Sequence, residues 1–176
     1  MANPEATLRA AEEAAAPPPG LLVESSALLR ILLEGDPALE ETVAGFEAYF
    51  TSALTLVEVP RALSRARREE RLNDGEAEVA HARFAAFARS CAVVEVTREV
   101  RVRAALDFPV EPVRSLDAIH LATLAVWAET IGPIVVASTD RRIRRNVRAL
   151  GHELVPAAME GDVRLPTSPP APAPPA

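Results

Sequence analysis

Two spacings of apolar residues alternate along most of the chain. Short runs of apolar, aromatic and β-branched residues, typical of strands, occur at 21–24, 48–52, 92–97, 133–138 and 153–155. Between them, apolar residues recur every three or four positions, which predicts helices at 26–33, 37–46, 56–71, 75–90, 98–106, 116–129 and 141–150. Strands that alternate with helices are typical of a parallel sheet covered by helices. We therefore expect an α/β domain with three layers and a central parallel sheet of four or five strands.

Proline residues mark the ends of this domain. Pro17, Pro18 and Pro19 precede Gly20, and six of the 16 prolines lie between Pro166 and Pro175. Such sequences favour extended or disordered chain over packed structure. We expect a Pro/Ala-rich tail at 1–20, one domain at 21–156 and a disordered Pro-rich tail at 157–176.

The composition excludes several classes of protein. All 19 basic residues are Arg, so enzymes that need a P-loop or Schiff-base lysine are ruled out. Cys91 is the only cysteine, which excludes an intramolecular disulfide and a cysteine-rich zinc site. The sequence contains neither a long apolar run nor the pattern of a signal peptide. We expect a cytoplasmic protein that does not contact a membrane.

Four carboxylates lie at the ends of predicted elements. Glu24 ends the first strand, Asp140 follows the fourth strand, and Glu58 and Asp117 lie in the first turns of helices. The carboxyl ends of parallel strands share one edge of a sheet, so these side chains can face a single crevice. Clustered carboxylates repel one another unless a cation lies between them. Ligation by oxygen alone favours Mg²⁺ or Mn²⁺ over zinc.

Each of these acids also has a structural explanation when taken singly. Glu58 lies three residues after Thr55, as in a capping box, and Asp140 is placed to cap the helix that follows it. Asp117 can simply complement a helix dipole. Only the four acids together indicate a metal site. His120 lies in an apolar run, and we expect it to have a packing role rather than a catalytic one.

The segments around these acids resemble a known family. They are 22–29, 51–59, 114–123 and 138–142, and the most specific of them contains Leu-Asp-Ala-Ile-His-Leu-Ala-Thr at 116–123. In order and spacing they are similar to the PIN-domain family and, more narrowly, to VapC toxins of bacterial toxin–antitoxin pairs. The resemblance covers 21–156 and implies a PIN-like fold.

The resemblance also implies an activity. A protein of this kind is expected to be a Mg²⁺-dependent endoribonuclease toxin that cleaves RNA phosphodiesters with a metal-activated water and leaves 3′-hydroxyl and 5′-phosphate ends. It implies a homodimer that a cognate VapB-like antitoxin inhibits. Glu24, Asp117 and Asp140 would bind the metal, Asp140 through water, and Glu58 would complete the catalytic set.

One residue departs from the family pattern. The first acid of the family is ordinarily Asp, whereas this chain has Glu24. The additional methylene moves the carboxylate by more than about an ångström, which is large where catalytic geometry must hold within ~0.5 Å. Reduced activity and full activity both remain open. The alternative function is a catalytically silent PIN-like module that binds RNA or a protein partner.

RNA binding requires positive charge, although the net charge of the chain is −6. The Arg residues at 141–148 begin directly after Asp140, and we expect Arg141, Arg142 and Arg145 to guide the phosphate backbone. The Arg residues at 61–71 are interleaved with acids and are more typical of a solvated helix face.

Two hydroxyl side chains flank the acids. Ser26 and Thr139 lie beside Glu24 and Asp140 and are candidates to orient water or phosphate. Hydroxyls at such positions more often stabilise the backbone.

Overall fold

The structure of the protein, a computed structural model, describes residues 20–132, 134–160 and 162. Most of the two expected tails, at 1–19 and 163–176, lies outside the described residues.

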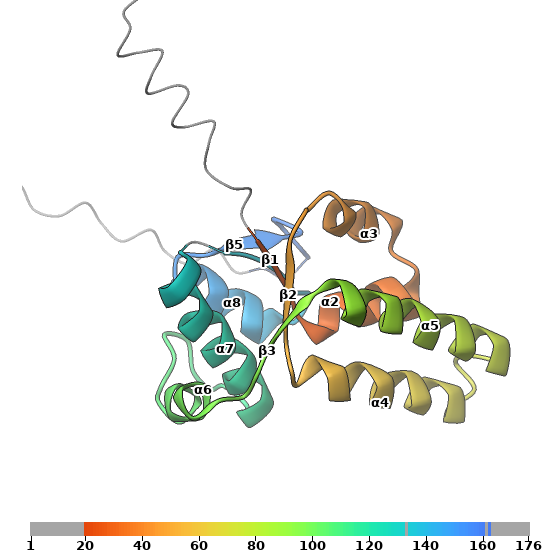
Figure 1. Ribbon diagram of the computed structural model, residues 1–176, viewed down its shortest axis with the longest axis horizontal. Helices are drawn as coiled ribbons and strands as arrows, with labels where there is room; N and C mark the ends of the chain where they lie inside the picture. The colour runs from red at the N-terminus through yellow and green to blue at the C-terminus, as the bar shows by residue number, and fades with distance from the viewer. Residues whose placement is uncertain (1–19, 133, 161, 163–176) are drawn as a thin grey trace, which may run out of the picture.

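A five-stranded parallel sheet forms the centre of the molecule (Figure 1). Its strands are β1 (Leu21–Val23), β2 (Tyr49–Ser52), β3 (Ala92–Val94), β4 (Val135–Ala137) and β5 (Glu153–Val155), in the order β3-β2-β1-β4-β5. β1 is the middle strand, and Leu22 is paired with Phe50 on one side and with Val136 on the other. The predicted parallel α/β sheet is confirmed, with shorter strands than expected at 92–97 and 133–138.

Helices cover both faces of this sheet. They are α2 (Ser25–Leu29) continued by the π-helix η1 (Arg30–Glu34), α3 (Pro37–Ala44), α4 (Thr55–Arg68), α5 (Asp74–Ser90), α6 (Arg98–Ala104), α7 (Ser115–Ile131) and α8 (Arg141–Ala149). Leu21 and Val23 of β1 are buried against the layer that holds α2 to α5, whereas Leu22 is buried against α6 to α8. Alternate residues of the central strand therefore face two separate apolar cores, as the period of a strand requires.

Two of the Arg residues of α8 are part of the fold and not of an exposed basic face. Arg144 is fully buried; it donates to the backbone oxygens of Ser138 (2.7 Å) and Pro156 (2.9 Å) and pairs with Asp162 (2.7 Å). Arg148 also donates to Asp162, at 2.6 Å. Residues 157–160 and 162, which we expected to belong to a disordered tail, include this partner. A buried guanidinium requires such partners, because unpaired charge is costly in the interior.

None of the helices in the described part of the chain has the length and hydropathy needed to cross a membrane.

Candidate active site

A cleft of about 500 Å³ lies at the carboxyl edge of the sheet. It contains all four carboxylates that the sequence singles out, Glu24, Glu58, Asp117 and Asp140. β1 and β4, which are adjacent in the sheet, end next to Glu24 and shortly before Asp140, while α4 and α7 supply the other two acids. Four segments that are distant in sequence thus place negative charge in one cavity.

Glu24 is the most deeply buried of these acids, with 6% of its surface exposed. Its Oε2 accepts hydrogen bonds from the hydroxyls of Ser26 and Ser138, the latter at 2.9 Å. Burial raises the pKa of Glu24, although nearby His120 and the two serine hydroxyls oppose that shift. The carboxyl group is therefore held in place but is costly to ionise without a cation beside it.

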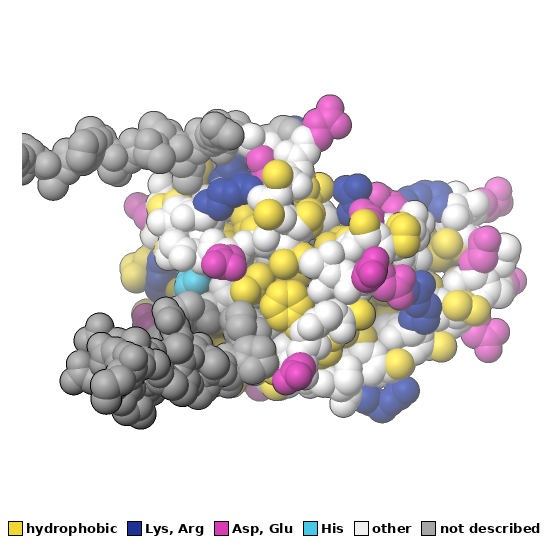
Figure 2. Space-filling model, turned by 90° about the horizontal axis from the view of Figure 1, so that it is seen from above, with side chains coloured by type: hydrophobic (Ala, Val, Ile, Leu, Met, Phe, Trp, Pro, Cys, Tyr) yellow, Lys and Arg dark blue, Asp and Glu magenta, His cyan; other side chains and the backbone are white. Residues whose placement is uncertain are grey.

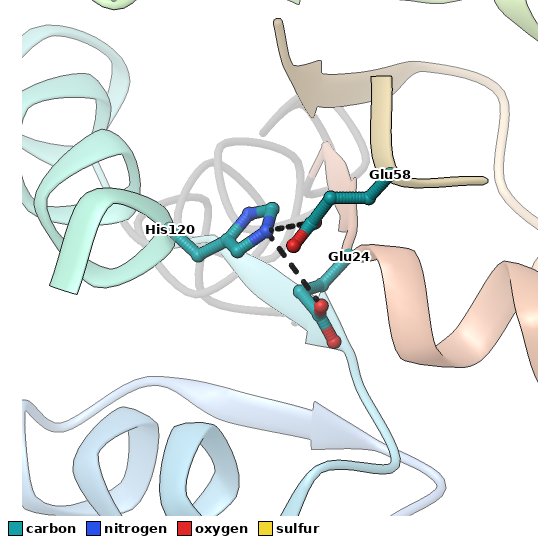
Figure 3. Close-up of side chains that lie close together, drawn as sticks. All are labelled: Glu24, Glu58 and His120. Atoms are coloured by element: carbon teal, nitrogen blue, oxygen red, sulfur yellow. Dashed lines mark hydrogen bonds and ion pairs between the residues drawn. The ribbon is translucent and has the colours of Figure 1, made fainter. Parts of the chain in front are cut away.

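Glu58 is bound to His120 and does not cap its own helix. Its Oε2 accepts from Ser25 Oγ at 2.5 Å and lies 2.7 Å from His120 Nε2 (Figure 3). Burial alone would raise the pKa of Glu58, but the hydrogen bonds from His120 and Ser25 together keep it below its ordinary value. The predicted capping box with Thr55 is wrong, because α4 begins after Leu54 without a side-chain cap and the Thr55 hydroxyl accepts from Ser25 instead.

His120 is part of the cleft, which the sequence prediction missed. Its Nε2 lies 2.7 Å from Glu58 Oε2 and 3.9 Å from Glu24 Oε1, and 6% of the residue is exposed. Burial would lower its pKa, but the hydrogen bond to Glu58 and the charges of the surrounding acids raise it. The signal was the three-residue spacing from Asp117, which places both side chains on one face of α7.

Asp117 has an oxygen that no described residue satisfies. Asp117 Oδ2 is buried and lacks a hydrogen-bond partner. Burial, followed by repulsion from Asp140, raises the pKa of this carboxyl group. An acceptor of this kind in a polar cleft is suited to a cation or an ordered water, because a buried oxygen left alone is unfavourable.

Asp140 has the structural role expected of a helix cap and also faces the cleft. Its Oδ1 accepts from the backbone N–H groups of Arg142 (2.7 Å) and Ile143 (3.1 Å), so it caps α8. Capping occupies that oxygen and fixes the direction of the carboxylate. The same residue lines the cleft with Asp117 and adds to its negative charge.

The Ser26 hydroxyl joins the ends of β1 and β4. It donates to Glu24 and accepts from the backbone N–H groups of Thr139 (2.9 Å) and Asp140 (3.0 Å). Ser26 therefore holds the Glu24 carboxylate and also fixes the backbone between β4 and α8. Thr139 contributes its backbone here, and its side chain does not line the cleft.

The basic residues at the cleft belong to α4 and not to α8. Arg61 and Arg65 line the cavity, whereas Arg141, Arg142 and Arg145 are absent from its walls. Neither Arg61 nor Arg65 forms an ion pair with another described residue, and both side chains are exposed. Two Arg residues of the run that we expected to be only a solvated face therefore line the cleft, while the charges of Arg142 and Arg114, outside its walls, oppose the rise in the pKa of Asp117.

The donor set of the cleft fits a divalent cation. One donor atom each from Glu24, Glu58 and His120 lies within 4.8 Å of the other two, and the unpartnered oxygen of Asp117 belongs to the same cavity. The sequence predicts ligation by oxygen alone, and the structure adds an imidazole nitrogen beside the carboxylates in this part of the cleft.

Fold and cleft together define an α/β protein with a carboxylate-lined cavity at the carboxyl edge of its parallel sheet. Residues 21–148 match the sequence model of the PIN domain, and the chain belongs to the PIN-domain family.

Solved structures agree with that fold. VapBC2 from Rickettsia felis, determined bound to a promoter DNA fragment, superposes with a TM-score of 0.52 at 7% identity, covering 72% of this chain and 92% of that one. VapC20 from Mycobacterium tuberculosis, a toxin that cleaves the sarcin–ricin loop, gives a TM-score of 0.52 at 17% identity, with coverage of 71% and 93%. Comparison with curated protein sequences gives no match.

Proposed function

We propose that the protein is a metal-dependent endoribonuclease toxin of the VapC kind. The observation that carries the proposal is the convergence of four acids, one with an unpartnered buried oxygen, in one cleft of a PIN domain. The VapC20 toxin, which shares the fold, cleaves the sarcin–ricin loop, and this supports RNA as the substrate that we propose.

The four acids of the cleft have different proposed roles. Glu24 and Asp117, which are buried or carry a buried oxygen, would hold the divalent cation, Mg²⁺ or Mn²⁺, and Asp140 would orient water beside it. Glu58 is fixed by Ser25 and His120 and would complete the set of acids around the cation. When bound, the cation lowers the pKa of a water molecule and offsets charge on the scissile phosphate.

Arg61 and Arg65 hold the phosphate backbone at the mouth of the cleft. On the part of the surface visible in Figure 2, acidic and basic side chains alternate around a group of hydrophobic ones, and no extended basic area is seen. Within the described part of the chain, Arg61 and Arg65 are the basic residues on the cleft wall, so the proposed contact with RNA phosphates is assigned to them. Both extend from the helix that carries Glu58, so a phosphate they bind lies beside the acids.

An antitoxin is the proposed partner. The Rickettsia felis structure with this fold is that of a VapBC pair, which supports a VapB-like inhibitor for this chain, and we further propose that the protein forms a homodimer. Co-purification of the chain with the product of a small adjacent gene, followed by mass measurement in solution, tests both statements.

Cleavage of a structured RNA tests the activity. We expect wild-type protein to cut it with Mg²⁺ or Mn²⁺, and we expect EDTA or the substitution Asp117→Asn to abolish cutting. Asp74→Asn is the matched control, because Asp74 is 92% exposed at the start of α5, away from the cleft. Tight RNA binding with no cutting by the wild type would instead support the silent module.

A further inference from the structure

The cluster of Glu24, Glu58 and His120 goes beyond what a carboxylate site for Mg²⁺ requires. Figure 3 shows the imidazole of α7 directed between the two carboxylates, one from the end of β1 and one from α4. His120 and Glu24 each expose only 6% of their surface. The imidazole is therefore largely shielded from solvent although His120 lines the cleft.

We propose that His120 Nε2 is a metal ligand together with Glu24 and Glu58, which makes this a mixed nitrogen–oxygen site that favours first-row transition ions over Mg²⁺. The inference rests on the proposed function, because it concerns the cation held in the same cleft.

The distances suit a shared ion. Metal–ligand bonds of about 2.0–2.2 Å place neighbouring donor atoms of one ion roughly 3 Å apart. His120 Nε2 lies 2.7 Å from Glu58 Oε2 and 3.9 Å from Glu24 Oε1, on either side of that value. To bind a metal, Nε2 must be the unprotonated nitrogen of the ring, as in histidine ligands generally.

The unusual Glu24 contributes to this arrangement. Its side chain is one methylene longer than Asp, and Ser26 and Ser138 hold one carboxylate oxygen while the other faces His120. An Asp at this position would withdraw the carboxylate from the 3.9 Å at which it now lies from Nε2. The length of Glu24 therefore brings its carboxylate close enough to His120 for both side chains to bind the same ion.

Metal choice follows from the donor types. Mg²⁺ strongly prefers oxygen ligands and keeps much of its water, whereas imidazole binds first-row transition ions and follows their usual order of affinity. One nitrogen among carboxylates consequently raises the affinity for Mn²⁺ and Co²⁺ relative to Mg²⁺.

Pulsed EPR of Mn²⁺ bound to the full chain tests the ligand directly. We expect nitrogen modulation from a coordinated imidazole in the wild type and its loss in His120→Asn. His152→Asn is the matched control and should keep the modulation, because His152 precedes β5 at the opposite edge of the sheet. Mn²⁺ bound in the cleft without nitrogen modulation would overturn the proposal.

Calorimetry separates this inference from the proposed function. We expect His120→Asn to weaken Mn²⁺ binding by roughly tenfold or more and Mg²⁺ binding much less, and Asp117→Asn to weaken both. Equal losses for the two ions in His120→Asn would reduce its role to positioning Glu58 and contradict the proposal. If His120→Asn does not fold, as judged by circular dichroism, His120→Gln replaces it and should reduce the same selectivity. Wild-type protein that binds neither ion would refute both the inference and the proposed function.

Discussion

At the scale of single residues, the neighbours of Glu24 fit the length of its side chain. The carboxylate is buried, receives two serine hydroxyls and lies beside His120, so its extra length is matched by contacts. A side chain that had lost its role would not need three neighbours to hold a costly buried acid. We infer that the site is built around Glu and is not attenuated by it.

Shortening this acid to Asp should therefore reduce function. Glu24→Asp withdraws the carboxylate from its contacts, and we expect the rate of RNA cleavage to fall roughly tenfold to a hundredfold, since displacements of about an ångström have such effects. Single-turnover cleavage rates at saturating metal measure this. A higher rate for Glu24→Asp would mean that the natural Glu attenuates the enzyme.

The residue scale also shows what the sequence can and cannot reveal about the site. Glu24, Asp117 and Asp140 are identifiable because strand and helix ends converge at one edge of a parallel sheet. His120 is not, because the side that an apolar helix turns toward a cleft depends on packing of the whole of α7. The capping box at Glu58 fails for the same reason, since tertiary partners outcompete the local one.

At the scale of elements, α8 is held by an ion pair between Arg144 and Asp162, a residue that follows the last strand of the sheet. Arg144 is fully buried and its Asp162 partner is 12% exposed, so the ion pair is nearly removed from water. In the sequence, Asp162 is one of three acids between the Arg run and the proline-rich segment, and no local rule joins it to Arg144. Strand and helix positions, by contrast, are predicted well because each depends on its own apolar period.

Breaking this pair should destabilise the domain. Asp162→Asn leaves Arg144 buried without its charged partner, and we expect the free energy of unfolding to fall by about 3–5 kcal/mol. Urea denaturation measures the change. Glu160→Gln is the control, because Glu160 is exposed and forms no ion pair with another described residue. A decrease below about 1 kcal/mol for Asp162→Asn would contradict the role assigned to the pair.

The same pair predicts a dependence on pH. Hydrogen bonds from Arg144 and Arg148 hold the pKa of Asp162 far below its ordinary value of 3.8. A lowered pKa in the folded state means that the stabilisation is present above the unfolded pKa and is lost as pH falls through the folded one. The difference in unfolding free energy between wild type and Asp162→Asn should therefore be constant near neutrality and shrink below about pH 4. A difference that grew on acidification would have the wrong sign.

At the scale of the whole molecule, the charge distribution bears on the RNA binding that we propose. The chain carries a net charge of −6, and the four acids of the cleft concentrate part of it where a phosphate must come close. A bound cation offsets that local charge, and Arg61 and Arg65 add positive charge from the cleft wall. The family and the fold are predictable from short motifs, whereas the choice between two Arg runs requires the folded shape.

The salt dependence of RNA binding shows whether RNA contacts the Arg residues of α4 or those of α8. Replacing both Arg61 and Arg65 by Ala should weaken binding and lower the slope of log affinity against log salt by about 0.7 for each phosphate that the protein no longer neutralises. Replacing Arg141 and Arg145 is the matched control with the same change in charge, and we expect a smaller effect. A larger decrease in affinity from the α8 pair would show that RNA follows that helix, as the sequence alone suggests.

The most direct test of the central claim is the chemistry of the RNA ends that the protein produces. Attack by a water held in the carboxylate cleft leaves a 5′-phosphate on one fragment and a 3′-hydroxyl on the other, and we predict these ends for wild-type protein with Mn²⁺ or Mg²⁺. Mapping the termini of a purified cleavage product decides it. A 2′,3′-cyclic phosphate would mean that the ribose hydroxyl is the nucleophile, and it would contradict the mechanism assigned to this site.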